Sequence, residues 1–148
     1  FKSQKKASAI MVSNIKNHLK ALVQISIIDR DFGEPERTYV YTIGKANKIP
    51  EDEIDAIVKE VLESKDNEEV NFDGLMSEER FDYLYDIVQL MKIDGEVFLT
   101  EIKYCEGVAE KLGYDRKVVK KMASRIYSDP SITGNREALM KEASKHLK

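Results

Sequence analysis

The chain has 148 residues, of which 42% are hydrophobic and 34% are charged, and its formal net charge at pH 7 is −3. This balance suits one soluble globular domain and provides no bulk positive charge for binding nucleic acid. The single cysteine, Cys105, excludes an internal disulfide, and no apolar run approaches the roughly 20 residues that span a bilayer. We therefore expect a cytoplasmic protein.

Apolar side chains at helical spacing predict helices along the whole chain. The first three helices are expected at about residues 8–29, 34–47 and 51–65. A polar, aperiodic stretch at about residues 66–76 is predicted to be a flexible linker. The last four helices are expected at about residues 77–94, 99–112, 118–127 and 134–147. Ser77 and Asp115 are the expected N-caps of the fourth and sixth helices, and Gly113 is expected to end the fifth.

An internal repeat organises these helices. The heptapeptide from Val23 to Asp29 returns from Val88 to Asp94, a shift of 65 residues. The same shift relates Ile43 to Val108 and continues into the third and sixth helices without a gap. The repeat copies are expected at about residues 8–65 and 77–128.

One segment of the first copy has strand-like residues, the run from Thr38 to Ile43. Its counterpart, Tyr104 to Val108, has a helical composition, and two copies of a repeat are expected to share one structure. We therefore predict an all-α, seven-helix bundle in a single domain, built from two helical repeats that are related by a pseudo-two-fold axis.

The second copy also carries a recognisable pattern. An apolar helix ends in Asp94-Gly95, a short turn follows, Glu101 opens the next helix, and that helix closes at Leu112-Gly113. In this pattern, and over most of the chain from about Leu22 to Tyr127, the sequence resembles the tellurite-resistance TerB-like family. The resemblance implies an all-α fold, a role in bacterial stress and a divalent-metal site made by acidic residues. A related domain occurs in membrane-tethered co-chaperones.

The first copy departs from this pattern at both turns. Arg30 stands where Gly95 stands in the second copy, and Asn47-Lys48 stand where Leu112-Gly113 stand.

Four repeated acids are the candidate metal ligands: Asp29, Glu36, Asp94 and Glu101. Each Asp ends a helix and each Glu opens the next one, so a two-fold packing of the copies would bring all four together. Converging carboxylates repel one another unless a proton, a base or a cation intervenes. Oxygen ligands alone favour Ca²⁺, Mg²⁺ or Mn²⁺ over zinc, and neither His18 nor His146 is near the repeated acids in sequence.

A structural role for the same acids is the alternative interpretation. Each Asp can accept hydrogen bonds from the free N–H groups that open the next helix, and each Glu suits a helix N-terminus. Basic neighbours such as Arg30 or Arg37 would balance their charge. An EF-hand does not fit, because Gly33 comes one position early and Val40 holds the place of the final Glu.

Other repeated polar residues favour a structural network. Gln24 and Gln89 lie within apolar stripes, and Tyr39 and Tyr104 are positioned to give them hydrogen-bond partners.

Charge is the second functional signal. The bases at the sixth helix are Arg116, Lys117, Lys120, Lys121 and Arg125. The corresponding first-copy positions hold Glu51, Asp52, Asp55, Ala56 and Glu60. A solvated surface explains this pattern, and so does a module that docks an acidic protein, an anionic membrane surface or a neighbouring copy.

An enzyme is the least favoured class, because no Gly-rich phosphate loop and no Ser-His or Cys-His pairing is found. The sequence thus predicts a non-enzymatic TerB-like accessory or interaction module that acts through a protein partner. A divalent metal at the repeated acids is one version of this prediction. A metal-free, co-chaperone-like module that docks on a protein or a membrane surface is the other.

Overall fold

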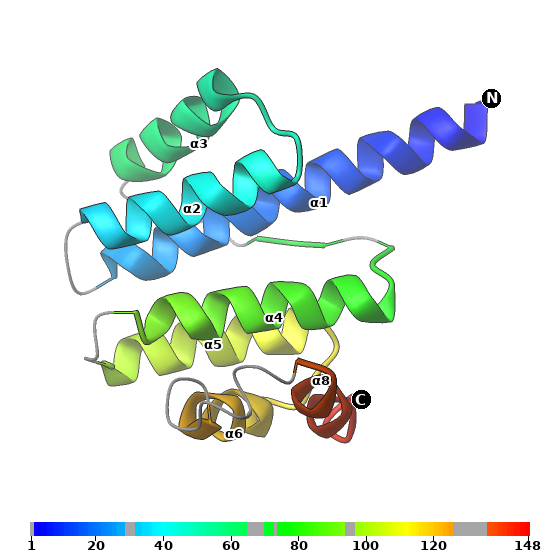
Figure 1. Ribbon diagram of the computed structural model, residues 1–148, viewed down its shortest axis with the longest axis vertical. Helices are drawn as coiled ribbons and strands as arrows, with labels where there is room; N and C mark the ends of the chain where they lie inside the picture. Colours follow the sequence, from blue (N-terminus) through cyan, green and yellow to red (C-terminus); the bar gives the residue numbers. More distant parts are fainter. Residues whose placement is uncertain (1, 29–31, 65–69, 73, 94–96, 126–135) are drawn as a thin grey trace. The chain divides into compact units, whose positions relative to one another are not determined.

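The computed structural model describes residues 2–28, 32–64, 70–72, 74–93, 97–125 and 136–148, with the backbone alone for residues 2–11, 125 and 136. Within these residues the chain forms seven helices and no strand, which confirms the all-α prediction (Figure 1). The chain divides into two compact units, Phe1–Gly74 and Leu75–Lys148, called here the first and second units. The boundary falls inside the stretch predicted as a linker.

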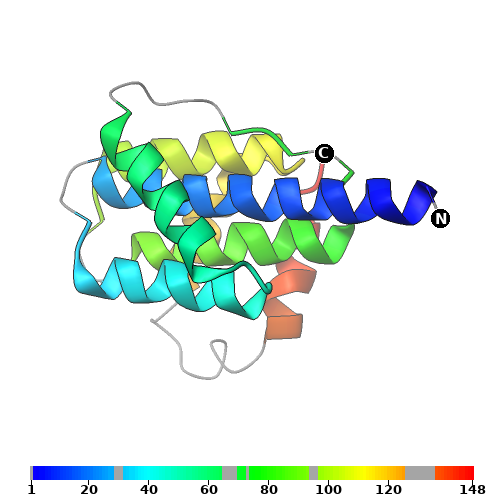
Figure 2. The same ribbon diagram turned by 90° about the horizontal axis from the view of Figure 1, so that it is seen from above.

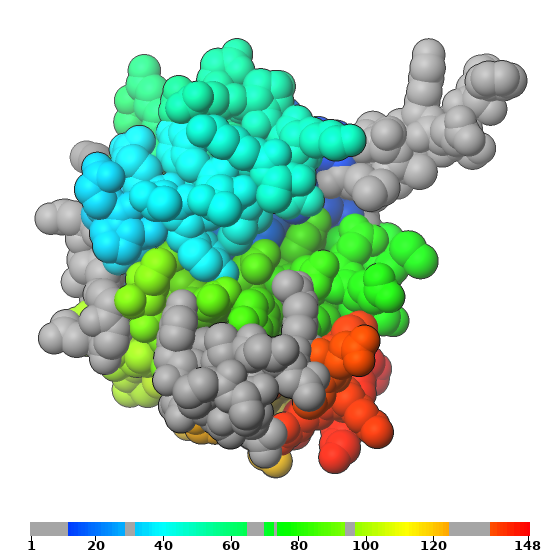
Figure 3. Space-filling view, viewed as in Figure 1, coloured from blue at the N-terminus to red at the C-terminus, as the bar shows by residue number. Residues whose placement is uncertain are grey.

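The first unit contains three helices, α1 (Lys2–Ile27), α2 (Glu34–Ala46) and α3 (Glu51–Glu63). Helix α2 runs antiparallel beside α1, and α3 crosses both (Figures 1 and 2). Leu19, Leu22 and Ile54 are fully buried where the helices meet. Figure 3 shows α2 and α3, in cyan to turquoise, forming one continuous surface on the side that faces the viewer.

The second unit contains four described helices, α4 (Ser77–Met91), α5 (Leu99–Lys111), α6 (Lys117–Arg125) and α8 (Arg136–Ser144). Helix α6 packs against α4 and α5, and α8 packs against α6 (Figure 1). Gly113 ends α5 with a φ of +92°, the left-handed conformation that glycine adopts at little cost, as the sequence predicts.

The helix bounds follow the shift seen in the sequence. Helices α2 and α5 both have 13 residues, and they begin at Glu34 and Leu99, 65 positions apart. The strand-like run from Thr38 to Ile43 lies inside α2, so its helical interpretation is confirmed. Helical packing decides this segment because Val40 is fully buried against the other helices.

Three local predictions need correction. Helix α1 begins at Lys2, six residues before the predicted start. Ser77 is the first residue of α4 and Met76 is its N-cap, whose N–H donates to Glu79 Oε1 at 3.3 Å. The predicted flexible linker is packed where it is described: Val70 is buried, and the Asn71 carbonyl accepts a hydrogen bond from Asn17 Nδ2 at 2.9 Å.

Cys105 is fully buried, and burial raises the pKa of its thiol well above the usual value. Its Sγ lies 3.7 Å from Met91 Sδ. A neutral thiol in apolar surroundings is unreactive, so Cys105 is an inert core residue. No helix in the described ranges has the length and apolar character needed to cross a bilayer.

Candidate functional site

The repeated acids are the first candidate site. Asp29 and Asp94 lie outside the described residues, so the predicted convergence of four carboxylates stays a prediction. Glu36 and Glu101 are described, and each is the third residue of its helix, α2 in the first unit and α5 in the second. Both are buried, with exposed fractions of 6% and 2%.

Glu101 caps its own helix. Its Oε1 accepts a hydrogen bond from the Phe98 N–H at 3.0 Å, three residues upstream. The first N–H groups of a helix have no partner within the helix, so a glutamate at this position satisfies one of them. Glu79 does the same for Met76 in α4. In the second unit, one carboxylate oxygen of the repeated glutamate therefore has the structural role of a helix cap.

Glu36 is held differently. The N-cap of α2 is Gly33. The Oε2 atom of Glu36 lies 3.0 Å from the point that a Cβ on Gly33 would occupy. The carboxylate thus folds back over the backbone of Gly33, where a larger residue would displace it. The Glu36 side chain makes no hydrogen bond and no ion pair with any other residue that the structure describes. A buried carboxylate without a described partner favours a bound cation or ordered water.

The donor set for a metal is incomplete in the described part of the chain. No group of three or more His, Cys, Asp or Glu side chains gathers there closely enough to hold an ion. His18 is buried and lies in α1. Of the four predicted ligands, Glu36 offers a carboxylate without a described partner, and Glu101 has one oxygen engaged by Phe98.

The repeated polar pairs lie partly inside the units. Gln24 is buried, whereas Gln89, Tyr39 and Tyr104 are half-buried. Burial raises the pKa of the Tyr104 hydroxyl, so this side chain stays neutral at physiological pH.

The basic residues at α6 are the second candidate site. Helix α6 is amphipathic: Val118, Val119 and Met122 are buried on one face. Arg116, Lys117, Lys120 and Lys121 are exposed and share the opposite side, since residues three and four apart are neighbours on a helix. We call these four residues the basic face. The side chain of Arg125, the fifth predicted member, is outside the described residues.

The basic face has little acid to neutralise it. The sequence of α6 contains no Asp or Glu. The Arg116 Nε atom lies 2.8 Å from Glu110 Oε1, in an ion pair at the edge of the face. Lys117, Lys120 and Lys121 make no ion pair with another described residue. Three cations therefore project from one short helix.

Two hydrogen bonds stabilise the ends of α6. The Asp115 Oδ1 atom accepts a hydrogen bond from the Lys117 N–H at 2.9 Å, which caps the helix as predicted and lowers the pKa of Asp115 below its usual value. The ammonium of Lys92, the C-cap residue of α4, donates to the Ala123 carbonyl in the last turn of α6. A cation suits a helix C-terminus, and burial lowers the pKa of Lys92. The helix that carries the basic face is thus capped at its start and bonded to Lys92 in its last turn.

Helix α3 in the first unit has the opposite sign. Glu51, Asp52, Glu53 and Asp55 are exposed in its first two turns. The Tyr41 hydroxyl donates to Asp55, and both line a groove of about 370 Å³ between α2 and α3. The charged side chains by which α3 and α6 differ are therefore exposed on both helices, as far as the structure describes them.

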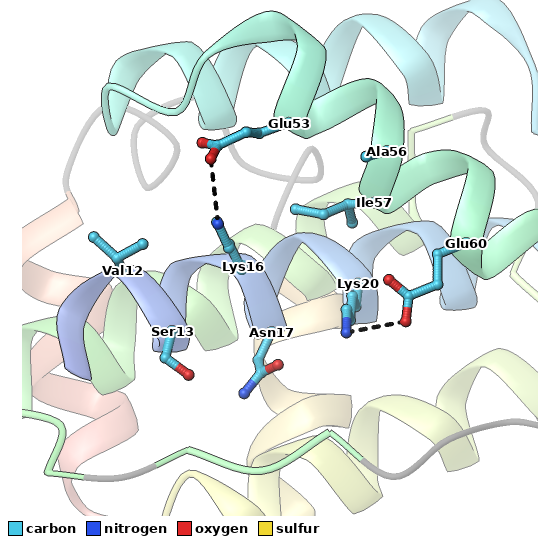
Figure 4. A pocket seen from close by; sticks show the side chains of 9 residues that line it. All are labelled: Val12, Ser13, Lys16, Asn17, Lys20, Glu53, Ala56, Ile57 and Glu60. Atoms are coloured by element: carbon cyan, nitrogen blue, oxygen red, sulfur yellow. Dashed lines mark hydrogen bonds and ion pairs between the residues drawn. The ribbon is translucent and has the colours of Figure 1, made fainter. Parts of the chain in front are cut away.

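A larger groove, of about 680 Å³, lies between α1 and α3 in the first unit (Figure 4). Lys16 of α1 pairs with Glu53 of α3 at 3.6 Å, and Lys20 pairs with Glu60 at 3.4 Å. The side chain of Ile57 points toward α1 between the two pairs. This groove could not be predicted from the sequence, because the spacing of lysines on one helix gives no information about which helix packs beside it.

Comparisons of sequence and fold bring no identification. No protein-family profile, curated protein or solved structure matches this chain. The resemblance to the TerB-like family stays a prediction that rests on the sequence pattern.

Proposed function

We propose that this protein is a non-enzymatic interaction module that docks an acidic protein surface through the basic face of α6. The supporting observation is the exposure of Lys117, Lys120 and Lys121 on a helix that carries no acid. Charges presented on a rigid helix steer an oppositely charged partner and fix its orientation. The four residues from α6 and its N-terminal turn make a patch, and the apolar side of the helix is already used for packing.

The resemblance to the TerB-like family extends this proposal. It describes the chain as two pseudo-two-fold related copies of one helical unit with an accessory role in bacterial stress. The 65-residue shift between the starts of α2 and α5 supports the duplication. On this view α3 and α6, the third helices of the two copies, have diverged in charge. Helix α6 has become basic and suits an acidic partner.

Binding to a labelled polyglutamate peptide tests the docking proposal. Lys117→Gln, Lys120→Gln and Lys121→Gln together should lower the affinity about tenfold, because three charge contacts of roughly 0.5 kcal/mol each are lost. The matched control replaces Lys59, Lys103 and Lys141, which are exposed on other helices, and changes net charge equally. Fluorescence anisotropy at low and high salt measures the peptide affinity of both triple variants.

Equal affinity of the two triple variants would contradict the proposal, because net charge alone would then explain the binding. Pelleting with phosphatidylserine vesicles addresses the alternative partner. A wild-type protein that pellets with these vesicles and ignores the peptide would favour a membrane-surface module instead.

A divalent ion at the repeated acids is the second candidate function. Glu36 favours it, as a buried carboxylate without a described partner. Glu36 and Asp29 would supply ligands in the first unit, and Glu101 and Asp94 in the second, with a preference for Ca²⁺, Mg²⁺ or Mn²⁺.

Calorimetric titration with each ion tests this second candidate. Wild-type protein should release or absorb heat on binding and should melt at a higher temperature with the ion present. Glu36→Gln and Asp94→Asn should each weaken these effects, whereas Glu34→Gln, an exposed acid in the same first turn as Glu36, should not. No heat and no melting shift at millimolar ion would end the metal hypothesis.

A further inference from the structure

Helix α8 covers one particular face of α6 in the second unit. Val118, Lys121 and Met122 of α6 lie against α8, where Leu139 and Ala143 face them. Val118 and Met122 are buried, and so are Leu139 and Ala143, with exposed fractions of 2% or less. A small apolar seam on α8 therefore completes the packing of α6.

The corresponding face of α3 in the first unit lines the groove between α1 and α3. The 65-residue shift relates Val118 to Glu53, Lys121 to Ala56 and Met122 to Ile57. These three first-unit residues, together with Glu60, are the α3 wall of the groove (Figure 4). The surface that carries a fourth helix in the second unit is thus an open groove in the first.

The groove has an apolar floor and charged walls. Ala56, Ile57 and Val12 provide the apolar part, and Val12 is 44% exposed. The α1 wall is basic, with Lys16 and Lys20, and the α3 wall is acidic, with Glu53 and Glu60. The ion pairs between the walls are partly exposed, and such pairs are weak enough to exchange partners.

We propose that this groove binds an amphipathic helix from a partner protein, in the position that α8 takes in the second unit. The floor selects a seam of small and apolar residues such as Ala and Leu. The walls select acids on the edge of the ligand helix that faces α1 and bases on the edge that faces α3. Residues 53 to 60 rise about 10 Å, so roughly two helical turns of the ligand fit the groove.

This proposal does not depend on the basic face of α6, since groove and face are in different units. It assigns a second docking surface with its own partner chemistry. A helix in a groove, anchored at positions i, i+3, i+4 and i+7, is a recurrent mode of peptide recognition.

A peptide-display library tests the inference. Every member is a short helix with glutamates along one edge and lysines along the other, and the seam positions vary among small and apolar residues. Selected peptides are then titrated into the full-length ¹⁵N-labelled protein. The expected result is amide shift changes centred on Val12, Ala56 and Ile57.

Two matched variants locate the binding. Ala56→Arg should lower the affinity at least about tenfold, because Ala56 is exposed and an arginine there fills the groove without disturbing the core. Thr42→Arg, at an exposed site in the groove between α2 and α3, should leave the affinity unchanged. Circular dichroism verifies that both variants remain folded.

A charge exchange tests the orientation. Lys16→Glu with Glu53→Lys, combined with Lys20→Glu and Glu60→Lys, reverses the two walls and should transfer the preference to peptides whose edges are exchanged. The proposal is wrong if the library yields no binder, if shifts map elsewhere or if Ala56→Arg has no effect. It is also wrong if wild-type protein dimerises and Ala56→Arg abolishes the dimer, since the occupant is then a second copy.

Discussion

Buried glutamates at the third position of a helix have different roles in the two units. Glu101 accepts the Phe98 N–H and belongs to the framework of α5. Glu36 turns back over Gly33 and has no described partner. One residue type at equivalent positions therefore provides a helix cap in one unit and, in the other, a carboxylate with no partner among the described residues.

The capping role of Glu101 can be measured as stability. Glu101→Ala should lower the free energy of unfolding by about 1–2 kcal/mol, because the Phe98 N–H loses its acceptor. Glu101→Gln retains an acceptor oxygen and should lose less. Urea unfolding gives the values, and Lys103→Ala, exposed on the same helix, should stay within about 0.5 kcal/mol of wild type. An alanine variant as stable as the Lys103→Ala control would show that the cap contributes nothing.

At the level of the helices, two equivalent packing positions hold side chains of different size in the two units. In each unit a smaller residue at one position is matched by a larger residue at the other. Gly44 of α2 is buried, and a Cβ on it would lie 2.6 Å from Cδ1 of Ile54 in α3. The 65-residue shift places Ala109 and Val119 at these positions in the second unit, and both are fully buried. The first unit thus combines the smaller residue on its second helix with the larger one on its third.

A double-mutant cycle tests this matching of side-chain size. Gly44→Ala should destabilise the protein by about 1–2 kcal/mol, because overpacking outweighs the gain of roughly 0.5–1 kcal/mol in helix propensity. Adding Ile54→Val makes room and should recover part of the loss, with a coupling free energy above about 0.5 kcal/mol.

The control for the cycle is Gly107 in α5, where a Cβ would meet no atom within 4 Å. Gly107→Ala should raise the free energy of unfolding by about 0.5–1 kcal/mol. Strict additivity of Gly44→Ala and Ile54→Val would argue against close contact at this position.

Across the whole molecule, one helix in each unit exposes charge of a single predominant sign. Helix α3 in the first unit exposes acids, and α6 in the second unit exposes bases, although the net charge is only −3. The low net charge therefore hides a strongly basic face that local recognition can use.

Much of the fold could be predicted from the sequence, because helical periodicity and punctuation are local. Gly113 and Asp115 mark the end of α5 and the start of α6 as predicted. The prediction of Ser77 as the N-cap of α4 was wrong by one residue. The Glu79 side chain accepts the Met76 N–H, so Met76 is the N-cap and Ser77 is the first residue of the helix. The groove between α1 and α3 could not be predicted, because Lys16 meets Glu53 only when the helices pack.

The candidate sites were predicted to different extents. The basic face followed from helical spacing alone, since Lys117, Lys120 and Lys121 share one side of any helix that contains them. Convergence of the repeated acids depends on long-range packing, which spacing does not provide. The absence of a described partner for the Glu36 carboxylate follows from how that carboxylate folds over Gly33. This placement also depends on packing and could not be predicted from spacing.

Charge reversal on α6 tests the central claim most directly. The variant Lys117→Glu, Lys120→Glu, Lys121→Glu should lose measurable binding to polyglutamate and gain binding to a polylysine peptide of the same length, with circular dichroism unchanged because all three residues are exposed. This reciprocal change is the predicted result, read by fluorescence anisotropy in one buffer. A reversed variant that keeps the wild-type affinity for polyglutamate would contradict the account.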